Sequence, residues 1–205
     1  VAGAAPAAQS VAALNNLLPQ QRFSTTELRA LDSGKAVVKS LDTPIRRELA
    51  HVGVVHIDAP PERFVERFRD IERFERGPGI PQIGRFGIPP RPEDLASLTL
   101  PARDLTGLST CRPCDCGLKL STAAITRFRN DVNWSSPTAA LQGHAVARAL
   151  LLELVQAYRA NGNAALGRYD DGGEPMSVAE EFRALLASGS RLPLPAPGLM
   201  AYLWG

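Results

Sequence analysis

Cysteine is scarce in this sequence, and its three residues all lie in the six-residue segment CRPCDC, Cys111 to Cys116. A disulfide-rich scaffold is therefore excluded, and a chain of 205 residues that is 44% hydrophobic can bury a core without one. Lysine is equally rare, since only Lys35, Lys39 and Lys119 occur. The formal net charge of +2 leaves no continuous basic stripe for a phosphate backbone, so we expect no nucleic-acid partner.

Long apolar runs are also missing. No stretch approaches the roughly 20 apolar residues that span a bilayer, and the best run, Ala145 to Leu152, is interrupted by Arg148. We therefore expect no membrane span. The sequence opens with VAGAAPAAQS, a run of small residues typical of the region beside a signal-peptidase cut. This predicts an exported protein, periplasmic or extracellular, with a flexible tail over residues 1–22.

Familiar catalytic motifs are absent as well. The sequence has no G-x-S-x-G elbow, no H-E-x-x-H helix and no phosphate-binding G-x-x-x-x-G-K-[ST] loop. Histidine occurs only as His51, His56 and His144. We expect no cofactor, and the sequence does not define a nucleophile with its base.

The elements that are present alternate between helix and strand. Ser24 and Glu27 have capping-box spacing ahead of a helix that Gly34 ends. The segments KAVVKSL and RELAHVGVVHIDA predict two strands of a hairpin, because valine and isoleucine concentrate there. The segment APPERFVERFRDIERFERGPG predicts one amphipathic helix, with Phe64 and Phe68 on its apolar side. Further strands are expected near residues 82–86 and at CGLKLS.

A long helix dominates the C-terminal half. The segment SPTAALQGHAVARALLLELVQAYRANG is apolar over much of its circumference and ends at Gly162. We expect it to lie against the sheet as the core element. The predicted fold class is α+β, an antiparallel sheet packed against a long C-terminal helix with additional short helices, in a single domain over residues 23–205.

The CRPCDC segment allows several kinds of chemistry. Zinc needs four ligands, whereas Cys111, Cys114 and Cys116 supply three, so a metal site built from these three sulfurs is the weaker alternative. A redox-active C-x-x-C motif usually opens a helix, and here a strand is expected instead. A disulfide between Cys111 and Cys116 is the preferred hypothesis, with Cys114 left as an odd thiol, free or buried. Three unreactive thiols remain the other possibility.

One resemblance covers most of the chain. The run VVKSLDTPIRRELAHVGVVHIDAPPERFVERFRDIERF, followed by CDCGLKLS, resembles a family of uncharacterised bacterial proteins that are usually predicted to be exported. The resemblance implies no activity. At the position of Cys114 that family favours a small residue such as glycine, so the third thiol has no role by resemblance.

A second, partial resemblance concerns Gly53 to Phe74. The run GVVHIDAPPERFVERFRDIERF is similar to the strand and helix of START-like (Bet v 1-like) ligand-binding domains. In those domains an apolar cavity forms between a curved antiparallel sheet and a long helix. The resemblance implies that the helix after Pro137 covers such a cavity.

These observations favour binding of a small apolar ligand, lipid-like or polyketide-like, without strong signs of catalysis. The ligand-binding candidates are His144, Arg148, Leu151 and Val155. One alternative is a START-like cyclase or isomerase in which His56 or His144 is the general base. Another is a structural or interaction protein of the cell envelope that docks through its proline-rich end and Trp204. No protein partner is predicted by name or class.

Overall fold

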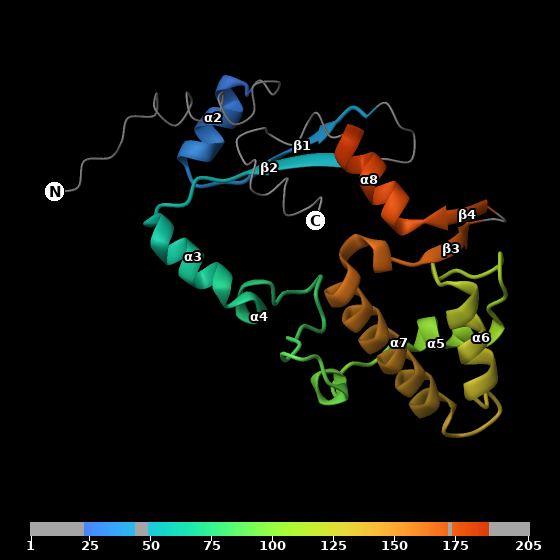
Figure 1. The fold of residues 1–205 in the computed structure, drawn as a ribbon. Helices are drawn as coiled ribbons and strands as arrows, with labels where there is room; N and C mark the ends of the chain where they lie inside the picture. Colours follow the sequence, from blue (N-terminus) through green and yellow to red (C-terminus); the bar gives the residue numbers. More distant parts are fainter. Residues whose placement is uncertain (1–22, 44–48, 172–173, 189–205) are drawn as a thin grey trace. The chain divides into compact units, whose positions relative to one another are not determined.

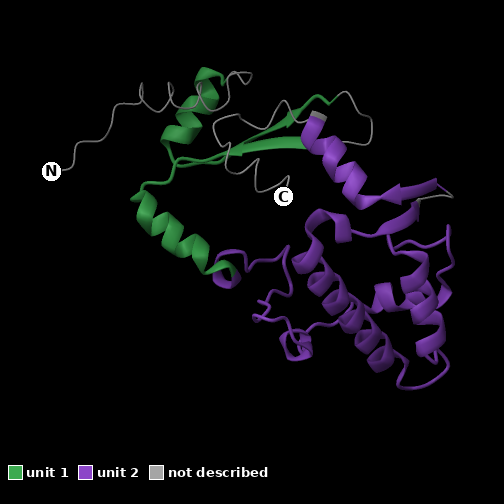
Figure 2. Cartoon of the chain, in the orientation of Figure 1, with its two compact units in different colours: residues 1–71, 190–196 green, residues 72–189, 197–205 purple. Residues whose placement is uncertain are grey.

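The computed structural model describes residues 23–43, 49–171 and 174–188 (Figure 1). Residues 1–22, predicted to form a tail, and Trp204 lie outside the described residues. The described elements are helices and two antiparallel sheets of two strands each, which confirms the α+β class. The chain divides into two compact units, residues 1–71 with 190–196 and residues 72–189 with 197–205 (Figure 2), where the sequence suggested one domain from residue 23 onward.

Unit 1 begins with helix α2 (Thr25–Asp32), whose start is fixed by the predicted capping box. The Glu27 backbone N–H donates to the Ser24 hydroxyl at 3.3 Å, and the Ser24 backbone N–H donates to the Glu27 carboxylate at 2.7 Å. These two bonds satisfy N–H groups that have no partner inside the helix. The chain then turns at Gly34, where φ is +74°.

Strands β1 (Val37–Leu41) and β2 (Ala50–Val54) follow as the predicted antiparallel hairpin. Their register runs from Val37 opposite Val54 to Leu41 opposite Ala50. Burial alternates along β2 as expected, with Val52 half-buried and His51 exposed. Strand β2 is shorter than predicted, because pairing with β1 stops at Val54.

Helices α3 (Pro61–Arg69) and α4 (Ile71–Phe74) replace the single helix that the sequence suggested, so that prediction is wrong in its length. The break falls at Asp70, whose ψ of 63° is not helical. Aspartate is a poor residue inside a helix, since its short side chain competes for backbone hydrogen bonds.

Unit 2 is built around α5 (Ala102–Thr110), α6 (Thr122–Asp131) and α7 (Ala139–Asn161), preceded by the 3-10 turn η1 (Pro92–Leu95). The end of α5, α6 and the first half of α7 share one hydrophobic core. Its buried members are Leu108, Cys111, Ile125, Phe128, Val132 and Val146. The core therefore fixes the N-terminal half of the long helix.

The remaining elements of unit 2 follow α7 in sequence. They are the turn η2 (Gly162–Ala165), the hairpin β3 (Arg168–Asp171) with β4 (Glu174–Ser177), and helix α8 (Val178–Ser188). The predicted cap of α8 is present, since the Glu180 N–H donates to the Ser177 hydroxyl at 3.3 Å. Among helices in the described ranges, none has the length and apolar character that crossing a bilayer requires.

The two strands expected near residues 82–86 and at CGLKLS do not form, so both predictions are wrong. In the first segment the side chain of Gln82, rather than a neighbouring strand, bonds the backbone of Thr99. In the second, Leu118 and Leu120 alternate with polar residues because they pack against the helical core. The alternation of apolar and polar residues there reflects packing against the helices, and no strand forms.

Candidate functional site

Helix α7 brings the four predicted ligand-binding residues onto one face. His144, Arg148, Leu151 and Val155 follow one another at intervals of four, three and four residues, which is the helical repeat. All four side chains are half-buried. The helix ends at Gly162, as predicted, where φ is +56° and the N–H donates to the Tyr158 carbonyl.

The two polar residues of this face contact the backbone just ahead of α5. The Arg148 Nε–H donates to the Leu98 carbonyl at 2.8 Å. The His144 Nε2 lies 3.4 Å from the Leu100 carbonyl oxygen. Both side chains therefore hold the chain segment ahead of α5 against the helix.

Two more polar residues continue this contact toward the end of α7. The Gln156 side-chain amide donates to the Pro90 carbonyl at 3.3 Å, and the Arg159 guanidinium donates to the Gly87 carbonyl at 3.5 Å. Side chains at four positions of α7 thus bond carbonyls between residues 87 and 100. The sequence does not predict this role, although the polar residues at positions 144, 148, 156 and 159 of a largely apolar helix are a visible signal of it.

The segment that α7 holds, residues 82–99, is called here the proline-rich loop. Its two ends are joined by the Gln82 amide, which donates to the Thr99 carbonyl at 2.7 Å and accepts from the Thr99 N–H at 2.8 Å. The Thr99 hydroxyl adds a third bond at 3.2 Å. The loop is therefore closed on itself at its base.

Asp94 organises the tip of the proline-rich loop. Its carboxylate accepts the N–H of Arg91 at 2.8 Å and the N–H of Gly87 at 2.9 Å. These two backbone bonds, with the Arg91 bond the larger cause, lower the pKa of Asp94 below its usual value because they favour the charged form. Leu95, next along the chain, is buried.

An apolar face remains partly open on the C-terminal half of α7. We define it as Leu151, Leu154, Val155 and Tyr158, which lie within two turns of one side of the helix. Leu154 is 42% exposed and Tyr158 is 44% exposed, whereas Leu151 and Val155 are half-buried. The Tyr158 hydroxyl lies 3.4 Å from the Asn163 side-chain oxygen, which puts a polar group at one end.

The catalytic candidates His56 and His144 belong to different units. His56 is exposed two residues after β2 ends. His51, on β2, lies 3.2 Å from the Ser40 hydroxyl through its Nδ1. His144 contacts the Leu100 carbonyl as described. Neither candidate has a nucleophile or carboxylate among the hydrogen-bond partners that the described residues give it, so general-base chemistry at these positions stays a prediction.

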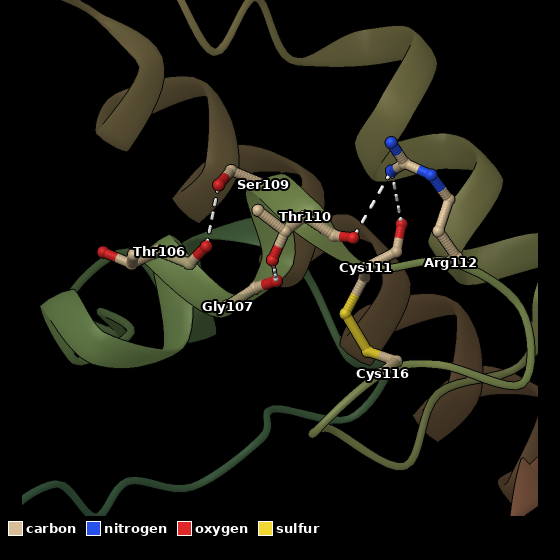
Figure 3. Close-up of a disulfide and its surroundings, with 7 residues drawn as sticks. All are labelled: Thr106, Gly107, Ser109, Thr110, Cys111, Arg112 and Cys116. Atoms are coloured by element: carbon tan, nitrogen blue, oxygen red, sulfur yellow. Dashed lines mark hydrogen bonds between the residues drawn. A yellow bond between two sulfur atoms is a disulfide. The ribbon is translucent and has the colours of Figure 1, made fainter. Parts of the chain in front are cut away.

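The CRPCDC segment forms the predicted disulfide between Cys111 and Cys116 (Figure 3). Cys111 is 2% exposed in the helical core, and Cys114 is an exposed free thiol. The Arg112 guanidinium donates to the carbonyls of Thr110 and Cys111 at 3.3 and 3.1 Å, closing the end of α5 (Figure 3). Two sulfurs held in a disulfide offer no thiolate to a metal, and the described ranges contain no group of three or more His, Cys, Asp or Glu side chains placed to hold one.

Comparison with known proteins gave no match, whether with family models, curated proteins or solved structures. The resemblances noted from the sequence therefore remain expectations. The function proposed below rests on the geometry of α7 and its neighbours.

Proposed function

We propose that this chain binds a small apolar molecule, lipid-like or polyketide-like, along the apolar face of α7. The observation that carries the proposal is the partial exposure of Leu154 and Tyr158 beside the half-buried Leu151 and Val155. Large apolar side chains that stay together at a surface mark binding sites more often than isolated ones do.

The packing around α7 leaves this face open for a physical reason. The helical core covers the helix near Val146, and the proline-rich loop is bonded along the line from Arg148 to Arg159. By helical periodicity, Leu154 and Tyr158 lie between these two contacts. An apolar molecule placed there would gain burial without displacing either neighbour.

The polar end of the face indicates the kind of molecule. Tyr158 combines an apolar ring with a hydroxyl beside the Asn163 side chain, and such residues occur where one end of a site is apolar and the other is wet. We infer an amphiphile with an apolar chain and one polar group.

The proposal includes an oxidising compartment. The Cys111–Cys116 disulfide is compatible with export to the periplasm or the cell exterior, where such bonds persist. We therefore retain the expectation, drawn from the sequence, that the protein is exported.

A titration with a polyene fatty acid, whose fluorescence rises in apolar surroundings, tests the proposal. We expect saturable binding to the full chain and weaker binding to Leu154→Gln. Losing about half of a leucine's burial costs about 1 kcal/mol, so the dissociation constant should rise about fivefold.

Leu141→Gln is the matched control. Leu141 lies on the same helix, is 70% exposed and is outside the apolar face, so this variant should bind like the wild type. Circular dichroism checks that both variants fold. Binding that never saturates, or equal losses in the two variants, would contradict the proposal.

A further inference from the structure

The CRPCDC segment contains a thiol and a disulfide within the same short turn. The Arg112 N–H donates to the Asp115 carbonyl, and the Asp115 N–H donates to the Arg112 carbonyl, both at 3.0 Å. Pro113 and Cys114 are therefore the two central residues of a tight turn. The disulfide closes the segment just outside this turn, where the Cα atoms of Cys111 and Cys116 are 4.6 Å apart.

This arrangement keeps the Cys114 thiol in the same six-residue segment as the disulfide. Two residues separate Cys114 from Cys111, and one residue separates it from Cys116. Confinement to one short loop makes the reaction between thiol and disulfide intramolecular, so it does not depend on a collision. Cys114 is also exposed, so its sulfur is accessible from solvent.

We propose that the segment is a thiol–disulfide exchange switch in which Cys114 replaces Cys116 as the partner of Cys111. The Cys114 thiolate attacks the Cys111 sulfur, a new S–S bond forms, and the Cys111–Cys116 bond breaks. The bonding electron pair leaves on the Cys116 sulfur, which then takes up a proton. One disulfide and one thiol exist before and after the step, so no external oxidant or reductant is needed.

The direction of the exchange follows from burial. Cys111 is 2% exposed among apolar side chains, where a thiolate is poorly solvated, so Cys111 is an unfavourable leaving group. Cys116 is only part-buried and can leave as a thiolate. The product pair, Cys111 with Cys114, has the C-x-x-C spacing of exchange-active disulfides.

The exchange has a structural consequence. In the observed state the disulfide ties the end of α5 to the segment from Cys116 to Leu120, which packs on the core and leads to the cap of α6 at Ser121. In the exchanged state no disulfide links that segment to the end of α5. The switch thus controls how firmly the connection between α5 and α6 is held.

Thiol counting on Cys116→Ser tests whether the alternative pair can form. The variant is refolded with a mixture of reduced and oxidised glutathione and titrated with a thiol reagent. The proposal expects no free thiol, with Cys111 linked to Cys114, and circular dichroism like that of the wild type. Two free thiols in a natively folded variant would overturn it.

Peptide mapping of the wild type supplies an independent test that does not depend on a variant. The oxidised chain is held at about pH 8.5 or pH 5.5, quenched in acid, alkylated and mapped by tandem mass spectrometry. Label should appear on Cys116 as well as Cys114, and sooner at the higher pH than at the lower, because the thiolate is the nucleophile. Cys114→Ser should remain unlabelled, and label confined to Cys114 at both pH values would overturn the proposal.

Discussion

Cys114 adopts a backbone conformation, φ +67°, that costs most residues free energy and glycine almost none. It follows Pro113 in a tight turn, and a positive φ at that position is typical of a type II turn, which favours glycine. The cysteine at this position therefore carries a conformational cost that glycine would avoid.

Replacing Cys114 with glycine should therefore stabilise the chain. Relief of the left-handed conformation outweighs the added entropy of the unfolded chain, and the net gain should be about 0.5 to 1 kcal/mol. Urea-induced unfolding followed by circular dichroism measures it. Cys114→Ser is the control, because it removes the thiol but keeps the backbone cost, and a gain of equal size in that variant would contradict the explanation.

Asp94 gives the proline-rich loop a dependence on pH. Its folded-state pKa is lowered by the backbone N–H groups of Arg91 and Gly87, so its contribution to stability is present above the unfolded-state pKa near 4. That contribution is lost as the pH falls through the folded-state value. We expect wild-type stability to fall more between about pH 5 and pH 2 than that of Asp94→Asn.

The measurement is the urea midpoint at several pH values for the two proteins. Asparagine has no charge to lose, so the difference between the proteins should be largest near neutral pH and shrink in acid. Parallel pH curves would show that Asp94 does not act in this way.

At the scale of elements, short-range signals were the reliable ones. The cap of α2 and the glycine that ends α7 depend on neighbouring residues, so the sequence predicted them correctly. Contacts at long range were not predictable. Arg148 donates a hydrogen bond to a backbone carbonyl fifty positions earlier in the chain. Because every residue has a backbone carbonyl, no sequence pattern reveals which one will be the acceptor.

The same limit explains the missing strands. Near residue 82 a strand needs a neighbouring strand, but the partner that the fold supplies is a single side chain, Gln82, on Thr99. Likewise, the four ligand-binding candidates could be assigned to one face of α7 from spacing alone. Spacing alone could not predict which of them would hydrogen-bond to the proline-rich loop.

Two glycines in helices test the packing of these elements. A Cβ built on Gly143 would lie 2.8 Å from a methyl carbon of Leu105, whereas a Cβ on Gly107 would have no atom within 4 Å. Gly143→Ala should therefore stabilise the chain less than Gly107→Ala does, by about 1 kcal/mol, because the Leu105 side chain must move to make room.

Gly107→Ala is the matched change and should stabilise by about 0.5 to 1 kcal/mol, since it gains helix propensity in α5 without crowding. Urea unfolding of both variants measures the two effects. Equal effects of the same sign would show that α7 does not approach Leu105 as closely as described.

At the scale of the whole molecule, the two units differ in how much they bury. Among the described residues, only Leu31 and Val37 of the buried hydrophobic residues belong to unit 1, whereas unit 2 contains the cluster around Phe128. A two-stranded hairpin has little stability of its own. The free energy of local opening should therefore be lower in unit 1.

Hydrogen exchange measures this difference directly. Amides of β1 and β2 should exchange at least tenfold faster than those of α6 and of α7 around Val146, because opening exposes less apolar surface in unit 1. Equal protection in the two units would mean that they unfold together.

The central claim is that the apolar face of α7 is where this chain binds a small apolar molecule. Methyl NMR of the chain labelled at leucine and valine, titrated with a medium-chain fatty acid, tests it most directly. The account predicts saturable shifts at Leu151, Leu154 and Val155, with Leu141 and the exposed Leu49 of unit 1 unchanged. Shifts confined to other residues, or none at all, would contradict it.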